Sequence, residues 1–382
     1  MTLVEMNSGA PFLPIEIISD VLKRLPVKSL IRFQTVCKLW KNLIKSPSFI
    51  ASHLDHSDRE NPSFIARGRN YVSGSSILHF LDRDLQLRQV QKNPFIDSLE
   101  CVWIVGSYNG LVCVQTGQPG TLYSLYLWNP AIREVIEVPR SRPNMDLCYF
   151  CSLGFAFSPT VNDYRIVIPY VKPGDEEYGF EAYSLTTNSW KNIGMGSLKG
   201  ICPFFDCVTL NGSMFWLASQ RGMASHGEDN TNVILSLYLA MDKFRLIPPP
   251  PLSRNEVAKL TEYENRLAVF HYSSALNTAN TSIDLWVIEE GIGGSWSKIL
   301  TCGPYPHFAI PLTIWRNQIL CDVFDECSVE GTDEIETTGS CLFDPISNEV
   351  KVLFSGRSGI LHVIFRYVES LVHICNIHTA KY

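Results

Sequence analysis

One phrase recurs six times along this 382-residue chain and constrains its fold more than any other feature. Each copy is a short apolar strand that ends near an aromatic residue, followed by a polar turn and a second short strand. The aromatic residues are spaced 48 to 57 residues apart: Phe80, Trp128, Tyr183, Tyr238, Trp286 and Phe343. From about residue 60 onward the chain is therefore expected to be all-β, built from repeated units of several strands.

A period near 50 residues is typical of a kelch-like β-propeller rather than of a solenoid. The last strand-like run, LHVIFRYVESLVHI at residues 361–374, has no hairpin behind it, whereas the first hairpin, around Phe80, has little in front of it. Pairing the two would complete a blade and remove exposed sheet edges. We predict six blades closed by the N- and C-terminal strands, while the irregular spacing leaves five or seven open.

The N-terminal stretch at residues 13–49 has a different pattern. Apolar residues recur at helical spacing up to Pro26, and two further helical stretches follow before Pro47. We expect three helices, with a first domain at residues 10–54 and the propeller at residues 55–382. A segment of about 40 residues rarely buries enough apolar surface to be stable alone. The remaining surface must be covered by the rest of the chain or by another protein.

The order Leu-Pro, helix, Leu-Pro-Val-Lys-Ser-Leu, helix and Val-Cys-Lys-x-Trp resembles the F-box, the adaptor-binding module of cullin-type ubiquitin ligases. The resemblance implies ten candidate adaptor-binding residues: Leu13, Pro14, Ile17, Val21, Leu25, Pro26, Leu30, Val36, Cys37 and Trp40. Some of these must hold the helices together, and the sequence does not divide the two roles. The alternative is a helical cap that packs only on its own chain.

A second resemblance covers roughly residues 100–372. The phrases SYNGLVCV, LWNPAIREVIEVP, GFAFSPTVNDYRIV and LNGSMFWLA look like the plant F-box-associated interaction domain, in the same order. The two resemblances together imply a substrate-recognition subunit of a Skp–cullin–F-box E3 ubiquitin ligase. Such a subunit binds a Skp-type adaptor, and through it a cullin, and presents a target for ubiquitination and proteasomal degradation. It is not an enzyme and needs no cofactor.

Composition narrows the remaining classes of partner. The formal net charge is -6 and only 18% of residues are charged, which argues against a nucleic-acid partner. No run of about 18 apolar residues occurs, which argues against a membrane span. The first twelve residues do not read as a secretory signal. We therefore expect the protein in the cytoplasm and/or the nucleus, with its twelve cysteines reduced.

No motif points to catalysis or to a metal. The pair Cys148 and Cys151 has metal-type spacing, but no second pair completes a zinc site. Neither a P-loop nor a G-x-S-x-G motif occurs. Two alternatives remain open: a propeller scaffold without a link to a ligase, and a carbohydrate-binding or hydrolytic propeller.

Five polar insertions fall in the same connection of the repeat, at residues 115–122, 171–179, 220–231, 273–281 and 324–339. Their formal charges total -9, against -6 for the whole chain. Equivalent connections project from one face of a propeller. This face is expected to bind a target protein with a basic docking segment, or the charges serve solubility alone. The candidate residues are Glu176, Glu177, Glu228, Asp229, Asp325, Glu326, Glu330, Asp333, Glu334 and Glu336.

Overall fold

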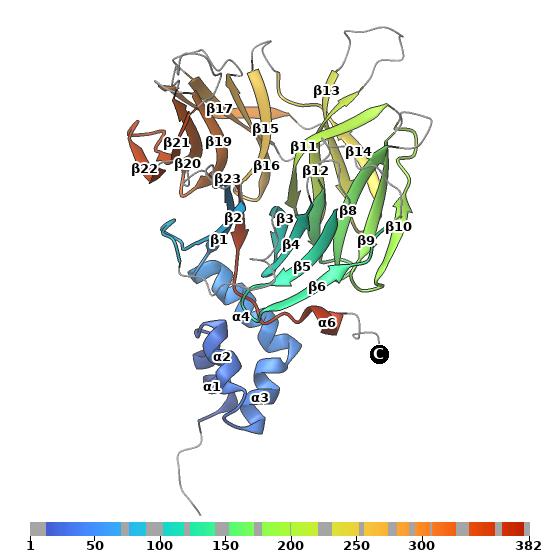
Figure 1. Ribbon diagram of the computed structural model, residues 1–382, viewed down its shortest axis with the longest axis vertical. Coiled ribbons are helices and arrows are strands. Elements are labelled where there is room, and N and C mark those ends of the chain that lie inside the picture. Colours follow the sequence, from blue (N-terminus) through green and yellow to red (C-terminus); the bar gives the residue numbers. More distant parts are fainter. Residues whose placement is uncertain are drawn as a thin grey trace, which may run out of the picture.

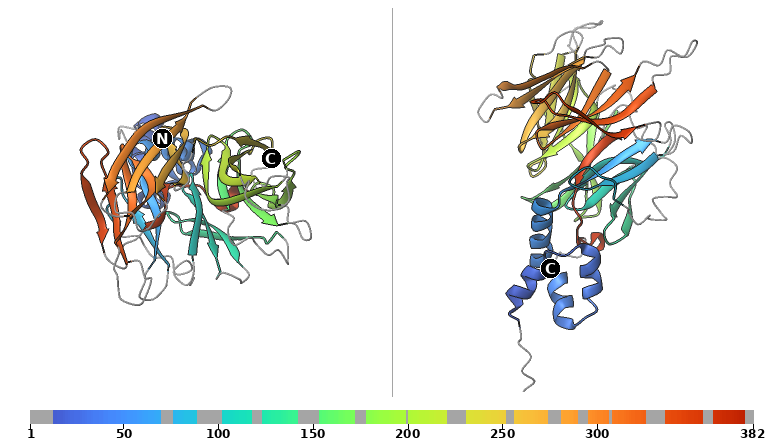
Figure 2. Two further views of the ribbon diagram at one scale, coloured as in Figure 1. Left: turned by 90° about the horizontal axis from the view of Figure 1, so that it is seen from above. Right: turned by 90° about the vertical axis from the view of Figure 1, so that its left-hand side faces the viewer.

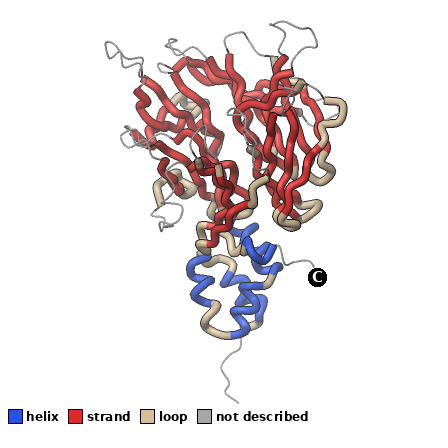
Figure 3. The backbone as a smooth tube through the Cα atoms, turned by 45° about the vertical axis from the view of Figure 1, so that its right-hand side comes forward, coloured by secondary structure: helices blue, strands red, loops and turns tan. Residues whose placement is uncertain are grey.

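Four short helices lie below a ring of β-sheets in the computed structural model (Figure 1). The structure describes residues 13–69, 76–88, 102–117, 123–141, 153–171, 178–198, 200–220, 231–251, 256–273, 281–289, 295–305, 308–325, 336–355 and 361–377. Figure 3 separates the helical part from the strand part of the chain. The helices are α1 (Ile15–Leu22), α2 (Val27–Phe33), α3 (Lys38–Lys45) and α4 (Pro47–Glu60).

Where the sequence predicted three helices, the structure has four, and Pro47 accounts for the difference. Pro47 ends α3, as expected, but it also begins α4 at a position where a missing amide hydrogen costs nothing. Ser46 caps this new helix, because its side chain accepts a hydrogen bond from the backbone N–H of Phe49 at 3.3 Å. Helix α4 therefore runs through residue 54, where the sequence placed the domain boundary, and ends at Glu60.

Five blades are four-stranded antiparallel sheets with consecutive strands. Blade 1 holds β3 (Val102–Tyr108), β4 (Leu111–Thr116), β5 (Ser124–Asn129) and β6 (Glu134–Val138). Blade 2 holds β7 (Gly154–Ser158), β8 (Asp163–Val171), β9 (Tyr178–Ser184) and β10 (Ser189–Ile193). Blade 3 holds β11 (Ile201–Leu210), β12 (Ser213–Gln220), β13 (Thr231–Tyr238) and β14 (Lys243–Ile247). Each repeat of the sequence is therefore one blade.

Blade 4 holds β15 (Glu256–Tyr263), β16 (Arg266–Ser273), β17 (Thr281–Ile288) and β18 (Trp296–Tyr305). Blade 5 holds β19 (Phe308–Trp315), β20 (Gln318–Asp325), β21 (Glu336–Phe343) and β22 (Val350–Ser355). Blade 6 joins the two ends of the chain in the order β2 (Ser76–Leu81), β1 (Ser63–Arg69) and β23 (Leu361–Tyr367). The short helix α6 (Ile374–Ile377) follows.

Strand β1 closes the ring by pairing antiparallel with β23, so that Ser63 lies opposite Tyr367. The Ser63 hydroxyl also donates to the Tyr367 carbonyl at 2.6 Å. The first strands β3, β7, β11, β15, β19 and β23 contact one another in sequence around the ring, and β23 returns to β3. Figure 2 shows the blades arranged around this centre. The prediction of six blades closed by terminal strands is confirmed.

Tight turns connect the first and second strands of the blades. Asn109 and Gly110 both have positive φ, at 51° and 77°, and Asn211 and Gly212 repeat this at 49° and 70°. Two consecutive positive values are the signature of the two-residue turn that suits the twist of a β-hairpin. Gly110 has a second reason to be glycine, because a Cβ there would lie 2.2 Å from the Cβ of Ser370. This turn is therefore packed against the C-terminal part of the chain.

Candidate functional site

The helical module exposes an unusual amount of apolar surface. We call this surface the apolar helical face, and it consists of Leu13, Ile15, Ile17, Val21, Ile31, Val36 and Leu39, each between 37% and 61% exposed. Ile17 and Val21 are four residues apart, so they lie on one side of α1, with Leu13 just before its first turn. Val36 lies in the turn that joins α2 to α3. Large apolar residues exposed in this number on a small module indicate an interaction surface.

The structure divides the ten predicted adaptor-binding residues into two groups. Leu30 is fully buried between the helices, while Leu25 and Trp40 are partly buried against the same core. Trp40 packs edge-on against Phe33 with 5.4 Å between ring centroids. The other seven are exposed and available to a partner: Leu13, Pro14, Ile17, Val21, Pro26, Val36 and Cys37.

Three exposed apolar residues were missed by the sequence prediction: Ile15, Ile31 and Leu39. Ile31 directly follows the buried Leu30, and Leu39 directly precedes the partly buried Trp40. Neighbouring helix positions face directions about 100° apart, so an apolar residue beside a core position must point elsewhere. Two adjacent apolar residues in a helix therefore indicate that one of them is exposed, and this pattern could have identified Ile31 and Leu39 from the sequence.

Basic side chains surround the apolar residues of α2 and α3. Lys28 and Arg32 are one helical turn apart on α2, and Lys38, Lys41 and Lys45 follow one side of α3. All five are exposed. No ion pair joins any of them to another residue in the described part of the chain, and the sequence has no carboxylate from Val21 to Leu54. This part of the module is therefore positive, although the whole chain carries -6.

The predicted target-binding surface belongs to the face of the propeller that points away from the helical module. The connections β4–β5, β8–β9, β12–β13, β16–β17 and β20–β21 each join a second strand to a third. The turns between first and second strands, such as Asn109–Gly110, lie beside the C-terminal segment near the helices. In an antiparallel blade the second strand runs away from that turn, so it ends on the opposite face of the propeller, where the third strand begins. The described strand ends that flank the five insertions thus share one face of the ring, on the side away from the helical module.

Most of the acidic candidates lie outside the described residues: Glu176, Glu177, Glu228, Asp229, Glu326, Glu330, Asp333 and Glu334. Asp325 and Glu336 are described in their backbone, where they pair across β20 and β21 at the base of the connection. Their positions agree with the predicted connection, and their role in target binding stays a prediction.

Several cysteines of the propeller are buried, Cys302 and Cys341 among them. Burial raises the pKa of Cys302 to about 12 and that of Cys341 to about 11, so neither is a thiolate at neutral pH. Among the described residues no cluster of three potential metal ligands occurs, and no helix there is long and apolar enough to cross a membrane. Cys148 and Cys151 lie outside the described residues.

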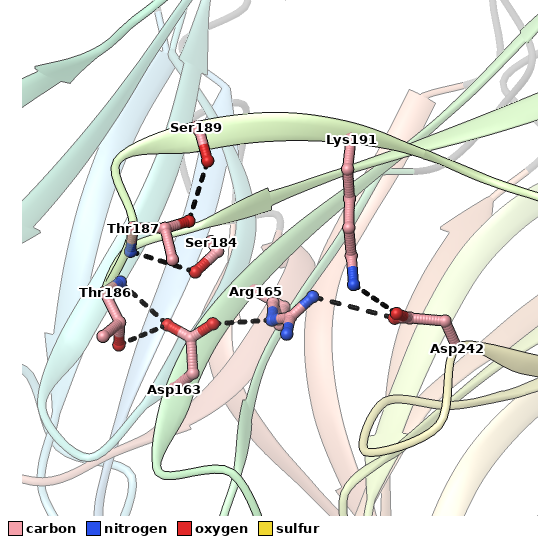
Figure 4. Close-up of polar contacts among 8 residues, drawn as sticks. All are labelled: Asp163, Arg165, Ser184, Thr186, Thr187, Ser189, Lys191 and Asp242. Atoms are coloured by element: carbon pink, nitrogen blue, oxygen red, sulfur yellow. Dashed lines mark hydrogen bonds and ion pairs between the residues drawn. The ribbon is translucent and has the colours of Figure 1, made fainter.

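A group of ion-paired and hydrogen-bonded side chains joins blades 2 and 3 (Figure 4). Asp163 accepts hydrogen bonds from the backbone N–H and the hydroxyl of Thr186, at 2.9 and 2.8 Å, and pairs with Arg165 at 2.6 Å. Arg165 lies 3.7 Å from Asp242 of the next blade, and Asp242 also pairs with Lys191. Charges of opposite sign face one another between the two blades, so this group is assigned a structural role.

Comparison with known proteins agrees with this architecture. Residues 77–374 match the F-box associated beta propeller domain, and residues 11–59 match the F-box domain. An F-box/kelch-repeat protein of Arabidopsis thaliana is 26% identical over 323 residues, covering 79% of this chain and 82% of the relative. An F-box protein of the same plant is 25% identical over 339 residues, covering 81% of this chain and 78% of the relative.

Among solved structures, TolB from Acinetobacter baumannii matches with a TM-score of 0.37 and 13% identity, over 81% of this chain and 75% of that one. A TM-score of this size supports no inference about function. The propeller match alone covers more than half of the chain. The chain belongs to the F-box-associated β-propeller family and carries an F-box at its N-terminal end.

Proposed function

We propose that this protein is the substrate-recognition subunit of a Skp–cullin–F-box E3 ubiquitin ligase. The observation that carries the proposal is the apolar helical face: Ile17, Val21 and Val36 are about half exposed, although other apolar residues of the same helices are buried in a core. Apolar side chains on a helical module gain free energy when a partner covers them, about 25 cal/mol for each Å² removed from water. The partner is a Skp-type adaptor, which links the chain to a cullin.

The propeller supplies the target-binding surface, and the chain itself performs no chemistry. The ligase assembly brings the ubiquitin-carrying enzyme, so a receptor needs only to hold its target. The face away from the helices is the target face, and its acidic insertions favour a target with a basic docking segment. Long-range attraction of this kind raises the association rate more than the final affinity. We place this function in the cytoplasm and/or the nucleus.

Co-purification from plant cells tests the proposal. The full-length chain should recover a Skp-type adaptor and a cullin, and proteasome inhibition should increase the recovery of its target. A chain that recovers stable partners but neither adaptor nor cullin would be a scaffold without a ligase link. Turnover of a glycoside by the purified chain would instead support the hydrolytic alternative.

A further inference from the structure

The last described residues of the chain, 368–377, form a segment that we call the C-terminal strap. It follows β23, the innermost strand of blade 6, and ends with α6. In Figure 1 the strap passes between the helices and the lower side of the propeller. It contacts both the helical module and blade 1, whereas the covalent connection from the module to the propeller is the short link between α4 and β1 of blade 6.

On the helical side, Leu371 is a member of the F-box core. It is 2% exposed and packs in one cluster with Leu22, Leu30 and Ile44 of the first three helices. The core of the N-terminal helices therefore includes a residue from the opposite end of the chain. The same cluster includes Ala131 and Ile132, from the turn between β5 and β6 of blade 1.

On the propeller side, polar contacts fix the strap to blade 1. The Asn129 side-chain amide donates to the carbonyl groups of Ser370 and Val372, at 3.1 and 2.8 Å. The carboxylate of Glu134 accepts from the backbone N–H groups of Ile374 and Cys375, at 2.8 and 3.2 Å. Asn129 and Ser370 are both fully buried. Buried hydrogen bonds of this kind hold a backbone segment in one position, because leaving them unmade is costly.

We propose that the C-terminal strap is a positioning element that fixes the F-box on the propeller and couples adaptor docking to the closure of blade 6. Two folded parts joined by one short link move relative to each other unless a sizeable interface holds them. The strap contributes the buried part of that interface, alongside Ala131 and Ile132 of blade 1, and Leu371 reaches the F-box core only when β23 is paired in blade 6. The functional consequence, a target held at a constant distance from the ligase, rests on the proposed function.

Leu371→Ala in the full-length protein tests the coupling without any partner. The control is Leu285→Ala, which removes the same atoms from a fully buried site in blade 4. Hydrogen exchange of the backbone amides of α1–α3 reports local opening of the F-box. We expect exchange there to be at least about tenfold faster in Leu371→Ala, because a core residue is lost, and unchanged in the control. Equal exchange in both variants would overturn the proposal.

A distance measurement tests the positioning role. Spin labels carried by unnatural amino acids at Lys41 and Met241, both exposed, report the separation of the F-box and the propeller. We expect one narrow distance distribution in the wild type and the Leu285→Ala control, and a broadened one in Leu371→Ala. Arg366→Gln removes the exposed ion pair between Arg366 of β23 and Asp58 of α4, not a core residue, and should broaden the distribution less. A narrow distribution in all four proteins would overturn the positioning role.

Adaptor affinity then connects the strap to the proposed function. Leu371→Ala should bind a Skp-type adaptor more weakly than Leu285→Ala does. Equal affinity would overturn the coupling of docking to closure. A wild type that binds no adaptor contradicts the proposed function instead, and the exchange and distance results still decide whether the strap positions the F-box.

Discussion

Asp58 at the end of α4 and Arg366 on β23 are ion-paired at 3.0 Å, although 308 residues separate them. The Arg366 guanidinium also donates to the Asp58 carbonyl at 2.9 Å. Burial raises the pKa of the nearby Glu262 on β15, and the charge of Arg366 acts against that rise. The last helix of the F-box is therefore bonded to the innermost strand of the closing blade.

The pairing of β1 with β23 predicts that the C-terminal strand is required for the whole propeller. Deletion of residues 361–382 removes the hydrogen-bonded partner of β1, which exposes the edge of blade 6, and it removes the contacts of β23 with blades 5 and 1. The truncated body should be cleaved much faster in limited proteolysis than the full-length protein. Deletion of the undescribed residues 378–382 alone is the control and should change little. Equal resistance of the long truncation would contradict closure by terminal strands.

The two roles within the F-box predict effects of different size on stability for two alanine substitutions. Leu30→Ala opens a cavity in the F-box core and should lower the free energy of unfolding of the helical module by about 2–5 kcal/mol. Val36→Ala, at a residue that is 61% exposed, should change it by no more than about 0.5 kcal/mol. Hydrogen exchange of the backbone amides of α1–α3, measured at increasing urea concentration, gives the change in unfolding free energy for both variants. A larger effect of Val36→Ala would mean that the assigned roles are reversed.

The carboxyl group of Asp322 predicts a pH dependence of stability. It is 3% exposed and accepts a hydrogen bond from Ser340 at 2.5 Å. Burial raises its pKa to about 7, against the opposing effects of the Ser340 hydrogen bond and Lys259. The folded state therefore retains a proton that the unfolded state releases, so this group lowers stability as the pH rises from about 4 to about 7.

Urea unfolding between pH 5 and pH 8 measures this dependence in the wild type and in Asp322→Asn. The Asp322 contribution can reach at most about 1.4 kcal/mol per pH unit. The variant has no such titration, so the difference in unfolding free energy between wild type and variant should shift in favour of the variant as the pH rises. A difference that does not vary with pH would show that Asp322 has the same pKa in both states.

The acidic insertion between β20 and β21 predicts an effect on target capture. Replacing its six carboxylates by amides should slow association with a basic target and weaken its salt dependence, because exposed charges are screened beyond about 8–10 Å. Adaptor binding should not change. Association kinetics at two salt concentrations check this. An unchanged rate would leave the six residues with a role in solubility only: Asp325, Glu326, Glu330, Asp333, Glu334 and Glu336.

The sequence predicted the ring well because each blade repeats a local signal. The turn in LWNPAIREV shows why: Asn129 accepts from the N–H of Ala131, and Asp344 does the same for Ile346 in the matching turn of blade 5. In each turn this hydrogen bond joins residues that are two positions apart in the sequence. The expectation that little precedes the Phe80 hairpin was wrong, because β1 lies directly before it. The sequence of β1, SFIARGR, lacks a clear alternation of apolar and polar residues, and the strand is held in place by pairing with β23.

The sequence could not assign individual roles within the F-box. Leu30 and Ile31 have the same apolar character, and only the packing of α2 on α1 and α3 decides which of them is buried. Leu371 could not be placed in that core either, because it comes from the far end of the chain and has no local pattern that points there. Long-range packing determines both cases. Pro47 was interpreted only as a helix end, although proline is equally common at a helix start.

The most direct test of the account is the affinity of the full-length protein for a Skp-type adaptor when the apolar helical face is made charged. Ile17→Asp with Val21→Asp changes two exposed residues on one side of α1, and Met241→Asp, on an exposed turn of the propeller, is the matched control. The double variant should keep the wild-type circular dichroism and bind at least about tenfold more weakly, because charges would be buried in the interface. The control should bind as the wild type does. Equal affinity of the double variant and the wild type would contradict the central claim that this face docks the adaptor.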